Sequence, residues 1–433
     1  MPSASPVIRL SCKSQSYEWG KLGSDSKVAQ LAAASPEFKS DAALPYAELW
    51  MGTHPNGASV SIDSPARTPL RELLTKENLG AKIHSQYGGD LPFLFKVLSI
   101  RKALSIQAHP DKQLAADLHG RFPDIYKDPN HKPEMAVALT PFEAFINFRP
   151  LHEIRAHLRE FPEFRALIGD ETAAAFESHV DRKDEDISKN KGSLKSLFKR
   201  LMESKQEDIE KQLDILIKRI HAEQKLSTTK GSNANGSESV KLYELVDRLH
   251  SQFPNDVGSF CAFLLNYVQL QPGESIFLAA NEPHAYLSGD CVECMAASDN
   301  VIRSGLTPKF KDVDTLVNCL TYNHGPAHTQ IMRGEPYQAT KHSVLYDPPI
   351  EEFSILRTTL AGGESENVGG IDGPSILVVT DGSGALKYVG EEGKEVEVQA
   401  QTGYVFFVAA GTNVTLTGAA NKGHFTAYRA FCA

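Results

Sequence analysis

Residues 271–286 read Q-P-G-E-S-I-F-L-A-A-N-E-P-H-A-Y, and residues 401–416 read Q-T-G-Y-V-F-F-V-A-A-G-T-N-V-T-L. The two stretches align at an offset of 130 residues without a gap, and they share the glutamine, the glycine, a phenylalanine and the Ala-Ala pair. A glycine turn, an apolar strand and a second turn into another strand form a unit of antiparallel sheet. We interpret the pair as an internal repeat and expect a duplicated β-barrel. Val414 stands where the first copy has His284, so we expect the first copy to carry the chemistry.

Length and composition are those of a globular protein with more than one domain. The 433 residues exceed what one hydrophobic core usually spans, so we expect two or three domains. The hydrophobic fraction is 41% and the charged fraction 23%, both ordinary values. The net charge of −9 argues against a broad basic surface, so we expect neither nucleic acid nor a membrane as a partner.

The N-terminal residues and the cysteines indicate a cytoplasmic protein. The stretch MPSASPVIRLSCKSQSYEWG lacks the apolar core of a signal peptide, and no window has the roughly 20 apolar residues of a membrane span. Six cysteines in so long a chain do not form a disulfide framework. The pair in Cys291-Val-Glu-Cys294 has no second pair at zinc-ribbon distance, so we expect buried, reduced thiols.

A charged segment with helical periodicity interrupts the strand-like sequence at residues 151–255. Its clearest apolar stripe consists of Ile209, Leu213, Leu216, Ile217 and Ile220. We expect an α-helical insertion domain here, with a flexible linker at residues 228–239, T-T-K-G-S-N-A-N-G-S-E-S. The long, proline-containing connection at 110–133 is expected to be irregular and either functional or disordered.

The strand-like segments on either side of this insertion divide into two further units. We expect residues 1–150 together with 256–330 to form the catalytic, metal-binding domain. Residues 331–433 would form a C-terminal barrel without a metal site, because no histidine lies between His342 and His424.

A short stretch, Ser105-Ile-Gln-Ala-His109, places a hydroxyl, an amide and an imidazole on one face of an extended strand. Aliphatic residues occupy the other face. These five residues alone favour a half-exposed strand with ordinary polar residues, but His131–Glu134 and Pro283–Tyr286 offer the remaining parts of a metal site and so favour a strand that lines a polar pocket inside a barrel. Just upstream, Lys96 interrupts the apolar run F-L-F-K-V-L. This lysine lies either at a sheet edge, with its ammonium group in solvent, or inside a pocket.

We predict that Gly289-Asp290 is a two-residue hairpin turn, which would bring a second group of polar side chains together. In that register His284, Tyr286 and Glu293 share one face, opposite an apolar face. A carboxylate beside an imidazole and a phenol is an acid–base arrangement. The alternative is a surface hairpin with an ordinary polar outer face.

Five motifs together resemble those of the type I mannose-6-phosphate isomerase family, in its eukaryote-like form within the cupin superfamily. They are Tyr17–Gly20 (Y-E-W-G), Ser105–Lys112 (S-I-Q-A-H-P-D-K), His131–Glu134 (H-K-P-E), Pro283–Tyr286 (P-H-A-Y) and Asp299–Lys309 (D-N-V-I-R-S-G-L-T-P-K). The resemblance extends from about residue 10 to the C-terminus and includes the insertion. It implies a mainly β fold with a helical insertion, made of two cupin-type jelly-roll barrels and one α-helical domain.

The resemblance implies a zinc-dependent enzyme that interconverts mannose 6-phosphate and fructose 6-phosphate and so supplies GDP-mannose synthesis. One zinc per chain would be bound by Gln107, His109, Glu134 and His284. Two imidazoles, a carboxylate and an amide oxygen are plausible zinc donors. Without the resemblance, the two histidines and the glutamate would indicate a facial triad for iron.

The same resemblance assigns catalysis to Arg303, which would stabilise the charge of an enediolate. For the base that moves a proton between C2 and C1 we favour Glu293, with Lys132 and Tyr286 as alternative proton carriers. The residues expected to bind the phosphate group are Ser105, Lys96 and Lys309.

Two other functions fit the same scaffold. One is a cupin iron dioxygenase, which Gln107 and the basic residues around the site disfavour. The other is a bicupin sugar-binding or storage protein, which would not need Glu293, Arg303 and Lys132 around one metal. We expect a monomer whose partner is a small sugar phosphate.

Overall fold

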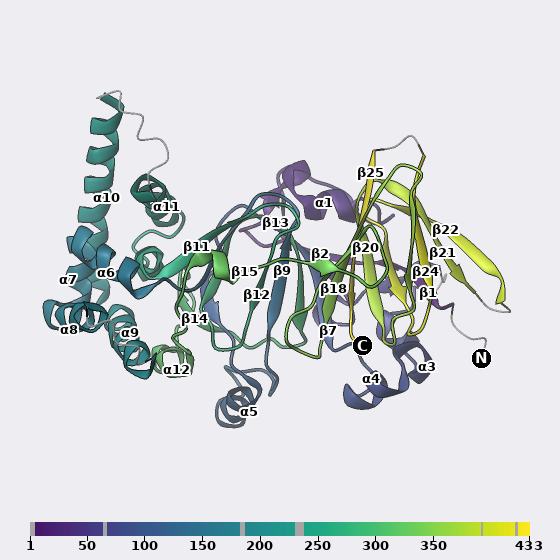
Figure 1. Ribbon diagram of the computed structural model, residues 1–433, viewed down its shortest axis with the longest axis horizontal. Coiled ribbons are helices and arrows are strands. Elements are labelled where there is room, and N and C mark those ends of the chain that lie inside the picture. Colours follow the sequence, from purple (N-terminus) through teal and green to yellow (C-terminus); the bar gives the residue numbers. More distant parts are fainter. Residues whose placement is uncertain (1–4, 64–66, 182–186, 230–237, 391–392, 421–422) are drawn as a thin grey trace.

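The structure is a computed structural model and describes residues 5–63, 67–181, 187–229, 238–390, 393–420 and 423–433. Three parts lie in a row (Figure 1): a helical domain, a central barrel and a C-terminal barrel. This arrangement confirms the expected fold class of two barrels with a helical insertion. Most of the predicted linker at 228–239 lies outside the described residues.

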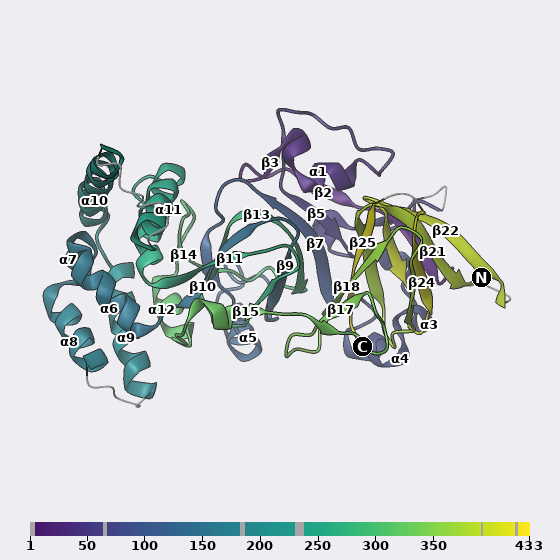
Figure 2. The ribbon, with the colours of Figure 1, turned by 45° about the horizontal axis from the view of Figure 1, so that its top comes forward.

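The central barrel is built on a branched antiparallel sheet whose strands curve round a common interior (Figure 2). Its strands, counted over the described residues, are β2 (Lys13–Gln15), β5 (Glu48–Met51), β7 (Phe93–Ile100), β8 (Ile106–Ala108), β9 (Glu134–Ala138), β10 (Phe142–Phe148), β11 (Leu265–Leu270), β12 (Ser275–Leu278), β13 (His284–Ala296), β14 (Ile302–Gly305) and β15 (Ile331–Met332). The longest of them, β13, pairs with β7, β8, β9 and β10, so it connects the branches of the sheet.

The C-terminal barrel combines a larger and a smaller antiparallel sheet. The larger sheet contains β1 (Val7–Ser11), β6 (Val60–Ser61), β16 (Glu335–Pro336), β17 (Ser343–Tyr346), β18 (Ser354–Ala361), β20 (Ser375–Asp381), β23 (Val405–Val408) and β25 (His424–Phe431). The smaller sheet contains β19 (Ser365–Gly369), β21 (Ser383–Val389), β22 (Glu395–Gln401) and β24 (Val414–Gly418). Because β1 pairs with β23 and β6 pairs with β1, two early strands complete this sheet, although the predicted division counts them with the catalytic domain.

Between β10 and β11, the described residues form six successive helices, which make up the helical domain at one end of the molecule (Figure 1). They are α6 (Leu151–Glu160), α7 (Pro162–Ile168), α8 (Asp170–Asp181), α9 (Ile187–Met202), α10 (Gln206–Thr229) and α11 (Glu238–Gln252). The predicted stripe on α10 is confirmed: Ile209, Leu213, Leu216 and Ile220 are buried, and Ile217 packs against the same core. Burial of that stripe accounts for the stability of a long helix whose other faces are charged.

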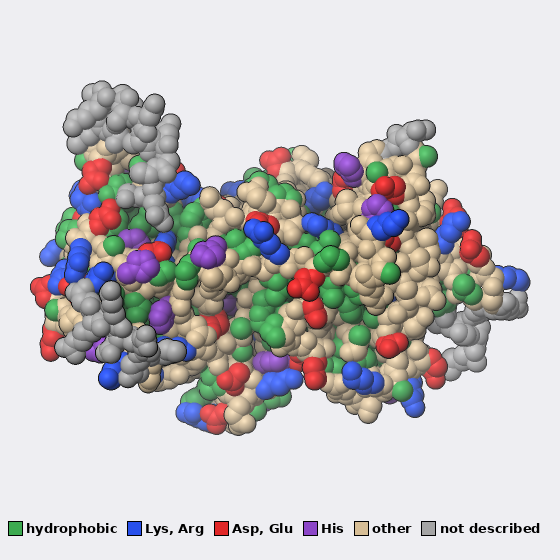
Figure 3. Space-filling view, viewed as in Figure 1, with side chains coloured by type: hydrophobic (Ala, Val, Ile, Leu, Met, Phe, Trp, Pro, Cys, Tyr) green, Lys and Arg blue, Asp and Glu red, His purple; other side chains and the backbone are tan. Residues whose placement is uncertain are grey.

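Shorter elements connect the strands. They are β3 (Lys21–Leu22), β4 (Pro45–Tyr46), α1 (Lys27–Ala32), α2 (Leu70–Leu73), α3 (Lys76–Leu79), α4 (Ala81–Gln86), α5 (Lys112–Arg121), α12 (Val313–Cys319), and the 3₁₀ turns Gly23–Asp25, Pro55–Gly57, Val257–Phe263 and Ala327–Gln330. None of the helices in the described ranges is both long and apolar enough to cross a bilayer. On the face shown in Figure 3, acidic and basic side chains are interspersed.

The two copies of the internal repeat have the same local structure. Strand β12 begins at Ser275 and β23 at Val405, while β13 begins at His284 and β24 at Val414, so both pairs keep the 130-residue offset. The shared glycines, Gly273 and Gly403, have φ values of 88° and 87°, a conformation that a glycine adopts without strain. The repeat therefore corresponds to a repeated strand–turn–strand unit.

The predicted hairpin at Gly289-Asp290 is wrong, because residues 284–296 form one continuous strand, β13. The side-chain alternation nevertheless shifts at Leu287, the extra residue of a bulge opposite Glu143 and Ala144, and Gly289, two residues later, has a φ of 107°. Tyr286 before the bulge and Cys291 after it lie in the same core cluster. His284, Tyr286 and Glu293 therefore do share a face, as expected, although a bulge and not a turn brings them there.

Two other segments differ from what their sequences suggest. The connection at 110–133 contains α5, which begins after Asp111 because that carboxylate caps the helix by accepting from the Leu114 amide at 2.9 Å. Residues 260–267 show helical spacing, but they form the end of a 3₁₀ turn and the start of β11. Buried aromatic packing against the helical domain overrides the local propensity there.

Candidate functional site

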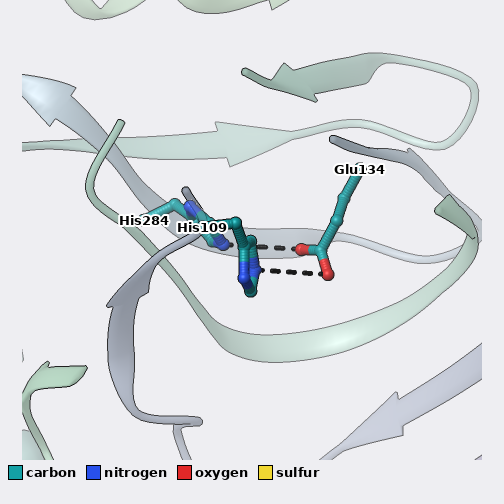
Figure 4. Close-up of side chains that lie close together, drawn as sticks. All are labelled: His109, Glu134 and His284. Carbon is teal, nitrogen blue, oxygen red and sulfur yellow. Dashed lines mark ion pairs between the residues drawn. The ribbon is translucent and has the colours of Figure 1, made fainter. Parts of the chain in front are cut away.

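His109, Glu134 and His284 meet inside the central barrel (Figure 4). His109 follows β8, Glu134 begins β9 and His284 begins β13, so three separate segments supply the cluster. One potential ligand atom from each residue lies within 4.8 Å of the others. All three residues are buried, at 3% exposure or less.

Main-chain carbonyls fix the orientation of both imidazoles. His109 Nδ1 lies 2.6 Å from the Asn300 carbonyl oxygen, and His284 Nδ1 lies 3.0 Å from that of Glu282. A carbonyl oxygen only accepts, so each Nδ1 carries a hydrogen, and each ring in its neutral form directs an Nε2 lone pair away from that carbonyl. Holding the imidazole by its other nitrogen in this way is typical of metal-ligating histidines.

These lone pairs face a carboxylate, which is an unfavourable arrangement without a cation. His109 Nε2 and His284 Nε2 lie 3.4 Å from Glu134 Oε1 and Oε2, respectively. Neither Nε2 has a hydrogen-bond partner among the described residues. Burial lowers the pKa of His109 to about 4, so its ring is neutral near pH 7. The three side chains therefore fit a metal ion bound between them.

Gln107 joins the metal cluster to Arg303 through the register of the sheet. It pairs directly with His284 on β13 and with Arg303 on β14. Directly opposed residues present their side chains on the same face, about 5 Å apart at Cβ. Arg303 is half-buried, and no hydrogen bond or ion pair engages its guanidinium within the described part of the chain. Burial lowers its pKa.

Lys96 is buried on an inner strand of the sheet and does not lie at a sheet edge. It is 7% exposed on the central strand β7, where it pairs with Glu293 of β13 and Trp50 of β5. Its Nζ lies 3.2 Å from Glu293 Oε2 and 3.4 Å from Glu48 Oε2. Lys96 is thus already engaged by two carboxylates.

Glu293 is a buried carboxylate among two lysines, Lys96 and Lys132, and two glutamates, Glu134 and Glu48. Burial raises the pKa of its carboxyl group, Lys96 opposes that effect, and Glu134 and Glu48 reinforce it. Tyr286 is buried nearby, and burial likewise raises the pKa of its hydroxyl group well above the usual value. The Tyr286 hydroxyl has no hydrogen-bond partner among the described residues.

The remaining predicted residues lie at different distances from the cluster. Lys132 belongs to it, because its Nζ is 3.3 Å from Glu134 Oε1. Ser105 is half-buried immediately before β8. Lys309 is exposed in the segment between β14 and α12, and no described contact joins it to the cluster.

Three residues of the site were not predicted. Glu48 binds Lys96, and the carbonyl groups of Asn300 and Glu282 orient the two histidines. A signal exists for Glu48, since it is the only charged residue in the apolar stretch A-E-L-W-M-G. The two carbonyl contacts have no signal, because any residue offers that group.

A carboxylate from the C-terminal half binds the two segments that carry metal-site residues. Glu352 Oε1 accepts from His131 Nε2 at 2.6 Å and from Lys112 Nζ at 3.0 Å. His131 precedes Glu134 by three residues, and Lys112 follows His109 by three. Glu352 is 3% exposed, so one buried carboxylate connects the C-terminal barrel to both segments.

Glu352→Gln is expected to lower the free energy of unfolding at pH 7 by about 1–3 kcal/mol, the cost of a lost charged hydrogen bond. Burial raises the pKa of Glu352, but His131 and Lys112 outweigh this effect and lower the pKa to about 2. Stabilisation by a depressed carboxyl pKa is present above the unfolded-state value and is lost as pH falls towards 2. Urea unfolding at pH 7 and pH 3 tests this, since the difference between variant and wild type should shrink at pH 3.

The neighbouring Glu351 provides a matched control for that measurement. It is exposed and contacts Gln86 at 3.0 Å. Glu351→Gln should change the urea midpoint little, because exposed pairs contribute little. Equal losses in the two variants would contradict a specific role for Glu352.

Family models match most of the length of the chain. The model of the type I phosphomannose isomerase catalytic domain matches residues 7–151. The models of the helical insertion domain and the C-terminal domain of the same family match residues 167–265 and 343–389.

Curated relatives and solved structures agree with these matches. The mannose-6-phosphate isomerase of Ogataea parapolymorpha is 47% identical over 443 residues, covering 100% of both chains. That of Saccharomyces cerevisiae is 44% identical, covering 98% of each chain. The apo mannose 6-phosphate isomerase of Salmonella typhimurium has a TM-score of 0.79 at 28% identity and covers 100% of both chains. A mannose 6-phosphate isomerase bound with zinc and yttrium has the same TM-score and identity and covers 99% of both chains.

Proposed function

Because the chain belongs to the type I phosphomannose isomerase family, we propose that it interconverts mannose 6-phosphate and fructose 6-phosphate. The observation that carries the proposal is the pair of buried imidazole lone pairs facing Glu134, with Glu293, Lys132 and Arg303 around them. We propose that this site binds one zinc ion per chain through Gln107, His109, Glu134 and His284. When bound, zinc would supply Lewis-acid polarisation of the sugar oxygens.

The reaction needs one base that reaches two adjacent carbons. Glu293 would remove the proton from C2 of mannose 6-phosphate and return it to C1, passing through an enediol. Its raised pKa makes the carboxylate a stronger base for removing the C2 proton, and the weakly acidic carboxyl group then holds that proton between the two transfers. Lys96 would keep Glu293 in position through their contact at 3.2 Å.

The reaction also requires groups that stabilise the enediolate charge and move a hydroxyl proton. Arg303 would stabilise the negative charge that develops on the enediolate oxygens, since its guanidinium has no carboxylate partner among the described residues. Lys132 and Tyr286 are the alternatives for moving the hydroxyl proton from O2 to O1. We assign the phosphate group to Ser105, Lys309 and Lys96, of which Lys96 contributes less because it already binds two carboxylates.

Several broader features belong to the same proposal. We propose a monomeric, cytoplasmic enzyme whose mannose 6-phosphate feeds GDP-mannose synthesis. We also propose the division into a catalytic domain of residues 1–150 and 256–330, a helical insertion at 151–255 and a C-terminal barrel at 331–433. The exceptions are the early strands β1 and β6, which belong to the sheet of the C-terminal barrel.

Metal analysis combined with an activity assay tests the function directly. We expect about one zinc per chain, isomerase activity under nitrogen, loss of that activity on chelation and recovery on adding zinc. Metal content can be measured by plasma mass spectrometry, and mannose 6-phosphate conversion by a coupled assay. Iron in place of zinc with a dependence on oxygen would favour the dioxygenase alternative. Bound zinc without isomerase activity would favour a sugar-binding protein.

A further inference from the structure

Equivalent positions in the two barrels can be identified from the pairing of their strands. In the central barrel, Leu278 of β12 pairs with Glu134 of β9, and two residues further along β9 Ala136 pairs with Glu293 of β13. Glu293 in turn pairs with Lys96 of β7. This path leads from the repeated strand to the metal ligand, the proposed base and its lysine.

The same path through the C-terminal barrel reaches different residues. Val408 of β23 is the repeat equivalent of Leu278 and pairs with Ser375 of β20. Two residues further along β20, Leu377 pairs with Arg429 of β25, which pairs with Leu356 of β18.

Each position in one path has its counterpart in the other. Ser375 occupies the place of Glu134, Arg429 that of Glu293, and Leu356 that of Lys96. Two buried carboxylates are thus replaced by a hydroxyl group and a guanidinium, and the buried lysine is replaced by an aliphatic side chain. The sign of the buried charge at the proposed base position is reversed.

Arg429 is buried in the interior of the C-terminal barrel with most of its donors unused. It is 2% exposed, and its strand neighbours Ala427 and Phe431 belong to the apolar cluster of that interior. Its Nε donates to Ser375 Oγ at 2.8 Å. Nη1 and Nη2 are buried and have no hydrogen-bond partner among the described residues, and no described carboxylate forms an ion pair with them.

A buried guanidinium in this state needs a compensating group. Burial lowers the pKa of Arg429 to about 10, so the group still carries its charge at neutral pH. Buried charges in proteins are normally paired, and buried donors are normally satisfied. Two adjacent, free Nη groups match the two oxygens of an oxyanion.

We propose that the interior of the C-terminal barrel binds a small oxyanion, such as a phosphate or carboxylate group, on Nη1 and Nη2 of Arg429. An opening of about 390 Å³ is lined by Phe431, which lies two residues after Arg429 on β25, and by Tyr337, among others, while Arg429 itself is not among its lining residues. Its lining includes Lys82 but also Asp347 and Glu351, so selection for an anion rests on Arg429. This inference is independent of the proposed isomerase activity, since no group of the central barrel takes part in it.

Calorimetric titration of the zinc-loaded protein with inorganic phosphate at constant ionic strength tests the proposal. Wild type should show a binding event that Arg429→Met loses or weakens by about 10- to 100-fold, as expected for one charge-assisted, two-point contact. Acetate, titrated in parallel, shows whether carboxylate serves as well as phosphate. Phosphate that binds in the central barrel adds equally to both proteins and cancels in the comparison.

Arg357→Met is the matched control, because Arg357 is a half-buried arginine of the neighbouring strand β18. It should retain the phosphate-binding event and isomerase activity, and Arg429→Met should also retain activity. If Arg429→Met does not fold, crystals of the wild type soaked in selenate provide the second measurement, with an anomalous peak expected at the Nη atoms. Identical titrations of wild type and Arg429→Met would overturn the proposal, as would ordered water alone on Nη1 and Nη2 after the soak.

Discussion

Glu134→Gln is expected to leave the protein folded but nearly free of zinc, with turnover reduced by about a thousand-fold or more, equivalent to about 4 kcal/mol of lost transition-state stabilisation. Glu134 is the one carboxylate between two imidazole lone pairs, each 3.4 Å from a carboxylate oxygen. Its amide counterpart has no charge and one acceptor atom fewer. The site would then consist of neutral donors alone, and a divalent cation would have no negative ligand.

The measurement is zinc content after dialysis, together with kcat for mannose 6-phosphate. Glu143→Gln is a suitable control, since Glu143 is a partly buried carboxylate of the same barrel that binds Ser288, Tyr267 and Arg248 away from the metal cluster. It should retain zinc. Full zinc occupancy in Glu134→Gln would contradict the assignment of Glu134 as a ligand.

Glu293→Gln is expected to retain zinc and to lower kcat by about 10²- to 10⁴-fold, the usual contribution of a general base. The amide keeps the shape of the side chain but cannot accept the proton from C2. Lys96 keeps a second carboxylate, Glu48, at 3.4 Å, so the ammonium group is not left without a partner. Steady-state kinetics with zinc-loaded enzyme, and the rate of exchange of the C2 proton with solvent, measure the effect.

The pH dependence of kcat provides a second measurement for Glu293. The base must be ionised, and burial raises its pKa, so activity should fall as pH drops through that raised value. Glu48→Gln removes one of the negative charges that raise it and should move the acid limb to lower pH, with turnover near neutrality little changed. An unchanged acid limb in Glu48→Gln and normal proton exchange in Glu293→Gln would assign the base to another residue.

The residues of the metal cluster could be predicted because short motifs carry them. Ser105–His109 and His131–Glu134 are short motifs of polar residues that can be recognised in the sequence without knowledge of the fold. The internal repeat likewise predicts two barrels. The structure agrees, because equivalent strands start 130 residues apart and the shared glycines have the same conformation.

The path of β13 could not be predicted from local signals. Gly289-Asp290 has the composition of a hairpin turn, yet both residues pair with β7, so the chain continues as one strand with a bulge just before Gly289. A Cβ at position 289 would lie 2.5 Å from the Pro141 carbonyl oxygen, so this glycine is required by packing. Contacts such as Glu352 with His131 join residues 221 positions apart, and no periodicity indicates them.

The position of β1 has a consequence for how the chain folds during synthesis. Strand β1, at Val7–Ser11, completes its ladder with β23, whose residues leave the ribosome almost four hundred residues later. Until then the first strand has no partner on that side, and in the absence of β1 the outer edge of β23 is an unpaired strand edge, open to pairing with another chain. Completion of the C-terminal sheet therefore depends on the pairing of β1 with β23, which has the greatest sequence separation among the described strand pairs. Such a long-range contact slows folding and exposes nascent chains to aggregation.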